Sequence, residues 1–76
     1  MSDEQAQHIR VLEALLFAAE EPLDDASLQA RLPEDAPLAG LLEELQATYA
    51  GRGVNLVHVA GRWAFRTAPD LAPAPP

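Results

Sequence analysis

The apolar pattern between residues 8 and 19 predicts an amphipathic helix, because large apolar side chains recur every three or four positions. The stripe comprises Ile9, Val11, Leu12, Leu15, Leu16 and Ala19. At about 100° per residue these positions span an arc of about 160°. Glu20-Glu21-Pro22 should end the helix, since Pro22 lacks an amide proton and disfavours a helical residue before it. Residues 1–7 are polar, and we expect them to be disordered.

One large aromatic residue of this helix does not belong to the stripe. Phe17 lies roughly 80° beyond Ile9, on the side that carries Arg10 and Ala14. An apolar side chain left outside the core either contacts a partner or packs against its own domain. The sequence leaves both interpretations of Phe17 open.

A short second helix is predicted over about residues 25–31. Leu23 lies in a short extended piece after Pro22, and Asp24 or Asp25 can cap the helix by accepting a backbone N–H. The apolar side chains Leu28 and Leu32 fall on one side of it.

A third helix is predicted after the loop at residues 33–35. We expect Asp35 or Ala36 to cap it, Pro37 to occupy its first turn, and Gly51 to follow its end. Its apolar face spans about 100° and comprises Leu38, Leu41, Leu42, Leu45 and Tyr49.

Residues 54–59 and 63–67 are rich in valine, aromatic residues and threonine, which predicts a β-hairpin that turns at Ala60-Gly61 or Gly61-Arg62. Either turn places bulky side chains on one face and a half-apolar, half-basic set on the other. The bulky face comprises Leu56, His58, Trp63 and Phe65, and the other comprises Val57, Val59, Ala64 and Arg66.

The order of elements predicts an α+β winged helix over residues 8–68, with three helices plus a two-stranded β-hairpin wing. Residues 69–76 (PDLAPAPP) contain four of the seven prolines, and we expect an extended tail or linker there. The 76-residue chain is near the size at which a single core is marginal, which favours association with a second copy or a partner.

Charge is divided unevenly along the chain. The total is −7, but residues 1–50 hold eleven acidic residues and two arginines, whereas residues 51–68 hold Arg52, Arg62 and Arg66 and no acid. The outward face of the third helix would carry Glu43 and Glu44 and no cation, which disfavours reading of DNA by that helix. The three wing arginines could support only weak contact with DNA or with an acidic partner.

The sequence offers no catalytic, metal or cofactor site. His58 is expected beside Trp63 and Phe65, without the hydroxyl and carboxylate of a nucleophilic site. Two distant histidines and no cysteine do not make a metal centre. No apolar run approaches the roughly 18 residues of a membrane span, and the polar start MSDEQAQH is unlike a signal peptide. We therefore expect a cytoplasmic protein that is not an enzyme and has no membrane contact.

Several short motifs resemble, in order and spacing, the family of segregation and condensation protein B. They are residues 12–18 (LEALLFA), 21–23 (EPL), 41–45 (LLEEL) with Tyr49, 51–57 (GRGVNLV) and 60–67 (AGRWAFRT). The family commonly has glycine after the position of Ala19, where this chain has Glu20, so the end of the helix depends more on Pro22.

The resemblance implies a non-enzymatic accessory subunit of the bacterial SMC condensin-like complex, which acts in chromosome condensation, segregation and cell division at the nucleoid. Family members carry two winged-helix domains in tandem, and this chain resembles the first. They form homodimers and bind a kleisin subunit (ScpA-like), which bridges the heads of an SMC ATPase.

The surface that remains apolar after the core is assigned predicts where this chain associates. For the dimer or partner interface we predict Arg10, Ala14, Phe17, Val57 and Val59. The alternative function is a sequence-specific DNA-binding winged-helix transcriptional regulator, which would contact DNA through the wing arginines.

Overall fold

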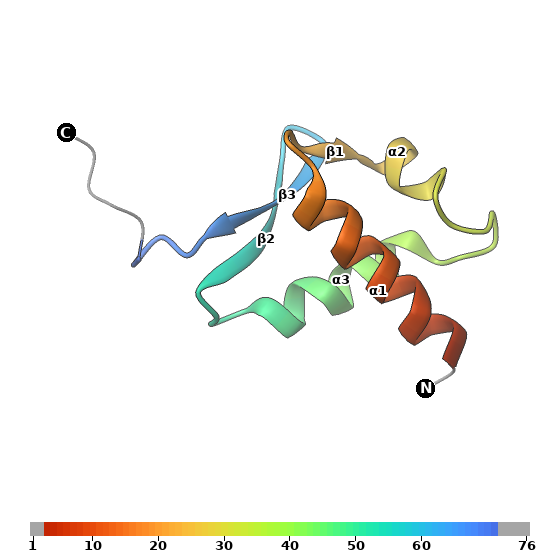
Figure 1. The fold of residues 1–76 in the computed structure, drawn as a ribbon, viewed down its shortest axis with the longest axis horizontal. Coiled ribbons are helices and arrows are strands. Elements are labelled where there is room, and N and C mark those ends of the chain that lie inside the picture. Colours follow the sequence, from red (N-terminus) through yellow and green to blue (C-terminus); the bar gives the residue numbers. More distant parts are fainter. Residues whose placement is uncertain (1–2, 72–76) are drawn as a thin grey trace.

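A computed structural model describes residues 3–71 of the chain (Figure 1). The elements are α1 (Asp3–Ala18), β1 (Leu23–Asp24), α2 (Asp25–Gln29), α3 (Leu38–Tyr49), β2 (Val54–Val59) and β3 (Arg62–Thr67). Helix α1 crosses over α3, and the hairpin β2–β3, called the wing below, lies beside this helical pair (Figure 1). The predicted order of helix, extended piece, helix, helix and hairpin is confirmed.

The sheet has three strands rather than the two predicted. Its strand order is β1-β3-β2, and all neighbours are antiparallel. The extended piece after Pro22 becomes β1, in which Leu23 pairs with Trp63 and Asp24 pairs with Arg62. This short strand covers an edge of β3 whose backbone groups would otherwise lack partners.

The register of the wing agrees with the sequence. Leu56 pairs with Phe65 and His58 pairs with Trp63, so the bulky side chains share one face as predicted. The hairpin turns at Ala60-Gly61, the first of the two alternatives, and both residues have positive φ, 54° and 77°. Such a turn matches the right-handed twist of the flanking strands.

Leucine side chains dominate the core between α1, α2, α3 and the sheet. Leu12 and Leu16 of α1 are buried, as are Leu28 of α2 and Leu56 of β2. Helix α3 contributes Leu41, Leu42 and Leu45. Val11 and Leu15, which the sequence placed in the same stripe as Leu12, are only partly buried and lie at the side of the core.

The start of α1 differs from the prediction. The helix begins at Asp3, so residues 3–7 are helical and the disorder expected for them is wrong. The side chain of Gln5 donates a 2.7 Å hydrogen bond to Glu44 Oε2 on α3, and this tertiary contact extends the helix beyond its apolar stripe. Residues 1–2 lie outside the described residues, as do residues 72–76 of the predicted tail.

The predicted boundaries of α3 are partly correct. Pro37 is the N-cap and makes no side-chain hydrogen bond, so the predicted cap at Asp35 or Ala36 is wrong. Ala36 is instead buried in the core, and its backbone N–H donates to Pro33 O at 3.0 Å in a turn that precedes the helix. Gly51 ends the helix as predicted: its φ of 79° allows a turn in which Arg52 N–H donates to Tyr49 O at 3.1 Å.

Asp24, one of the two predicted caps of α2, is its N-cap. The backbone N–H of Ser27 donates to Asp24 Oδ1 at 2.8 Å. Hydrogen bonds from Ser27 stabilise the ionised carboxylate and hold the pKa of Asp24 below its ordinary value of 3.8.

Asp24→Ala should therefore lower the melting temperature at neutral pH and have less effect in acid. A carboxylate whose folded-state pKa is depressed stabilises the fold above its unfolded pKa, and this stability disappears as the pH falls through the folded-state value. Melting curves followed by circular dichroism at neutral and acidic pH check this. Glu34→Ala, at an exposed loop acid, is the control, and an equal loss for Asp24→Ala at both pH values would contradict the prediction.

Candidate protein-binding surfaces

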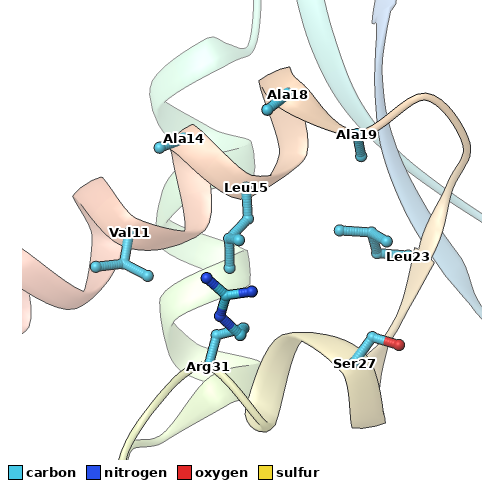
Figure 2. A pocket seen from close by; sticks show the side chains of 8 residues that line it. All are labelled: Val11, Ala14, Leu15, Ala18, Ala19, Leu23, Ser27 and Arg31. Carbon is cyan, nitrogen blue, oxygen red and sulfur yellow. The ribbon is translucent and has the colours of Figure 1, made fainter.

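An open groove lies between the C-terminal half of α1 and the segment formed by β1 and α2. Its volume is about 520 Å³, and its lining residues, shown in Figure 2, are Val11, Ala14, Leu15, Ala18, Ala19, Leu23, Ser27 and Arg31. Leu15 and Leu23 point into the space between the two walls (Figure 2). We call this surface the α1–α2 groove.

The α1–α2 groove has different charge at its two ends. Arg31, just beyond α2, extends its guanidinium toward α1 (Figure 2), and this group has no hydrogen-bond or ion-pair partner among residues 3–71. Leu23 and Ser27, at the other end, also line an adjoining hollow whose walls include Glu21, Asp24 and Arg62. Arg31 therefore makes one end of the groove positive, whereas acidic and basic side chains lie together at the other end.

Phe17 lies on the other flank of α1, within an aromatic cluster. Its ring stacks on Phe65 with centroids 4.2 Å apart and planes 15° apart, and it meets the edge of Tyr49 at 6.0 Å. Even so, 53% of Phe17 is exposed. One face of the ring therefore packs on its own domain, and contact of its exposed part with a partner stays a prediction.

Polar groups fix the aromatic cluster in place. The Tyr49 hydroxyl donates a hydrogen bond to a Glu13 carboxylate oxygen. This hydrogen bond raises the pKa of Tyr49 above its ordinary value of 10.0, because the donor is the neutral phenol. The guanidinium of Arg52 lies 5.8 Å from the centre of the Tyr49 ring, at a distance suited to a cation–π contact. Arg52 is thus partly engaged within the domain.

The outer face of the wing combines apolar and basic side chains. Val57 is partly buried and 62% of Val59 is exposed. Together with Pro22 and Ala64 they line a shallow hollow that also includes the exposed residues Arg62 and Arg66. Arg10 and Ala14 are exposed on α1. The five predicted interface residues are thus divided between two surfaces, one on α1 and one on the wing.

The outward face of α3 is acidic, as the sequence indicated. Glu43 is exposed and Glu44 is partly exposed, and no arginine or lysine lies on this helix. Gln46, the one amide side chain of this helix, donates to Leu56 O at 3.1 Å and so covers a carbonyl of β2. A helix with this face would repel the phosphates of a DNA major groove.

His58 is paired with an aromatic ring rather than with a catalytic group. Its imidazole stacks on the Trp63 indole with centroids 4.0 Å apart, and Trp63 Nε1–H donates to Asp25 Oδ1 at 2.8 Å. Within residues 3–71 no group of three histidine or acidic side chains is arranged to hold a metal ion. None of the helices in that range is long and apolar enough to cross a membrane.

The α1–α2 groove is not evident from the sequence alone. The pattern places Val11 and Leu15 in the apolar stripe of the first helix, and Arg31 is one of the two arginines among residues 1–50. One feature of the sequence does indicate the groove. The apolar stripe of α1 spans about 160°, which is wider than the apolar stripe of about 100° on α3, the helix that α1 packs against. The excess apolar width on α1 is the part that lines the groove.

The fold defines the class of protein. Three helices, with a strand between the first two that pairs with a C-terminal hairpin, form a winged-helix domain. Its surface has exposed apolar side chains on both flanks of α1. It is acidic on α3, the helix that lies in the major groove in winged-helix proteins that read DNA. Residues 10–74 match the model of the family described as segregation and condensation complex subunit ScpB, and the chain belongs to this family.

Individual relatives agree with this membership. The chain is 41% identical over 68 residues to a segregation and condensation protein B homolog of Coxiella burnetii. The match covers 83% of this chain and 32% of that protein. A crystal structure of ScpB from Mycobacterium tuberculosis superposes with a TM-score of 0.77 at 26% identity, over 92% of this chain and 46% of that one. The chain thus spans a third to a half of the length of these relatives.

A third relative has almost the same extent as this chain. It is a solved dimer of the ScpB N-terminal domain complexed with a ScpA peptide, with a TM-score of 0.73 and 27% identity. The match covers 100% of this chain and 99% of that one. The structure described here therefore corresponds to an N-terminal ScpB domain.

Proposed function

We propose that this domain acts by association, as a non-enzymatic part of an accessory subunit of the SMC complex in chromosome condensation and segregation. It forms a homodimer through α1 and binds the ScpA-like kleisin, which connects it to the SMC ATPase in the cytoplasm at the nucleoid. The observation that carries the proposal is the apolar surface on both flanks of α1, which includes Phe17 on one side and the α1–α2 groove on the other.

Two further observations support association over DNA reading. The acidic outward face of α3 would repel phosphates, and an N-terminal domain of the same extent has been solved as a dimer with a ScpA peptide. Contiguous apolar surface on a small domain commonly marks an interface. The wing arginines Arg62 and Arg66 are exposed and could contact an acidic partner at its rim.

The mass of the chain in solution, alone and with the kleisin of the same organism, tests this proposal. Size-exclusion chromatography with light scattering should give twice the monomer mass of 8.2 kDa for the chain alone. A mixture with the kleisin should elute as one larger complex. A monomer at high micromolar concentration that does not elute with the kleisin would refute the proposal.

The competing function, a DNA-binding regulator, requires a different result. Duplex DNA should bind the chain only weakly, and binding should disappear as salt rises, since few cations are available to release counterions. Tight binding at physiological salt that is lost in Arg62→Ala with Arg66→Ala would favour the regulator.

A further inference from the structure

We infer that the α1–α2 groove holds a segment of the partner protein that places an apolar side chain between α1 and β1 and a carboxylate against Arg31. This inference rests on the proposed binding of the kleisin. It adds the location of the bound segment and its chemistry.

The walls of the groove fit an apolar segment. Six of the eight lining residues are apolar, and three of these are alanines, at positions 14, 18 and 19. Alanine side chains let a bound chain approach the helix backbone closely, while Leu15 and Leu23 flank the space left between the walls (Figure 2). The volume of about 520 Å³ is within the range of about 300–1,000 Å³ that is typical of ligand sites.

Arg31 specifies a carboxylate within that segment. It is the one arginine or lysine between positions 11 and 51 of the sequence, and within the described residues its guanidinium has no partner. A guanidinium presents a planar set of N–H donors that matches a carboxylate in a bidentate pair. Beside an apolar wall, such a charge-assisted pair is stronger than one fully surrounded by water.

The opposite end of the groove carries charges of both signs. Leu23 and Ser27 adjoin Glu21 and Asp24 there, but also Arg62, which is paired with Asp24 across β1 and β3. The carboxylate of the segment is therefore assigned to Arg31, whose guanidinium has no partner within the described residues.

The position of the groove leaves the Phe17 flank of α1 free. At about 100° per residue, Val11 and Leu15 point roughly 120–160° away from Phe17 around the helix. A domain paired through Phe17 can therefore still hold a segment in the groove. A second copy of the chain is the competing occupant, and it predicts that groove substitutions alter self-association.

Fluorescence anisotropy with labelled overlapping peptides that tile the kleisin of the same organism tests the inference. The peptide that binds the wild-type chain should contain a carboxylate near large apolar side chains. Arg31→Ala should weaken its binding about tenfold, as expected for loss of a hydrogen-bonded charge pair. Ala18→Glu, which fills the groove with an acidic side chain, should weaken it at least as much. Arg52→Ala, at an exposed arginine outside both the groove and the adjoining hollow, should leave it unchanged.

A charge exchange supplies the decisive result. The Arg31→Glu variant should no longer bind the wild-type peptide. It should bind a peptide in which lysine replaces the acidic residue. Peptide binding that is indifferent to Arg31→Ala and Ala18→Glu would overturn the groove while leaving the proposed function standing. Failure of every peptide and of the intact kleisin to bind would overturn both. Altered sedimentation of the chain alone in these variants would assign the groove to a second copy and overturn the inference.

Discussion

Leu42→Ala is expected to lower the free energy of unfolding by about 2–5 kcal/mol, the range measured when a buried leucine is truncated. Leu42 is 1% exposed and lies in the central leucine cluster with Leu12 and Leu45. Small domains have stabilities near the lower end of about 5–15 kcal/mol. The substitution should therefore leave a substantial unfolded population without denaturant.

Urea unfolding followed by the fluorescence of Trp63, the single tryptophan, measures this loss directly. Leu71→Ala is the matched control, because Leu71 is 61% exposed and its truncation should change the free energy of unfolding by less than about 0.5 kcal/mol. Both variants must be compared at one protein concentration, since association stabilises the folded state by mass action. Equal effects at the two positions would show that the leucine cluster is not the stabilising core.

The sequence predicted those parts of the fold that depend on local patterns. The leucines of α3 have the spacing of one helical face, and they are the buried residues of that helix. The two-residue turn at Ala60-Gly61 fixes which residues of the two wing strands pair and which face each side chain occupies. The pairing of Leu56 with Phe65 therefore follows from their distances in sequence from the turn. Gly51 ends α3 as predicted, because glycine has no Cβ and so adopts a positive φ without steric strain.

The differences arise where distant segments meet. β1 exists because Leu23 lies beside Trp63, forty positions later in the chain. The first turn of α1 contacts Glu44 through Gln5, which no local pattern indicates. The stack of Phe17 on Phe65 and the α1–α2 groove likewise depend on how α1 crosses the sheet and α2. Tertiary geometry of this kind is set by packing of the whole core.

Under the proposed function, the two flanks of α1 serve separate partners. Phe17 and Arg10 lie on one flank, the groove residues Val11 and Leu15 lie on the other, and Ala14 stands between them. Substitutions at Phe17 should leave the groove intact, because Val11 and Leu15 point roughly 120–160° away from Phe17 around the helix. Self-association and partner binding can therefore be measured and altered independently.

Phe17→Asp is expected to weaken the homodimer at least about tenfold, the effect of losing one buried aromatic anchor from an interface. The new carboxylate would lie one turn from Glu13 on a chain of net charge −7, so repulsion adds to the lost apolar contact. Sedimentation equilibrium over a range of concentrations measures the change. Val59→Asp, on the exposed wing, tests separately whether the wing belongs to the same interface.

The stack of Phe17 on Phe65 means that Phe17→Asp also removes a contact within the monomer. The emission of Trp63 must therefore show that the variant is folded at the temperature of measurement. Arg10→Glu keeps the test valid in either case, because Arg10 is exposed and its side chain donates only to Gln7, one turn earlier on the same helix. If both variants are folded and still dimerise with wild-type affinity, α1 is not the interface; if the wild type is monomeric, the chain does not self-associate.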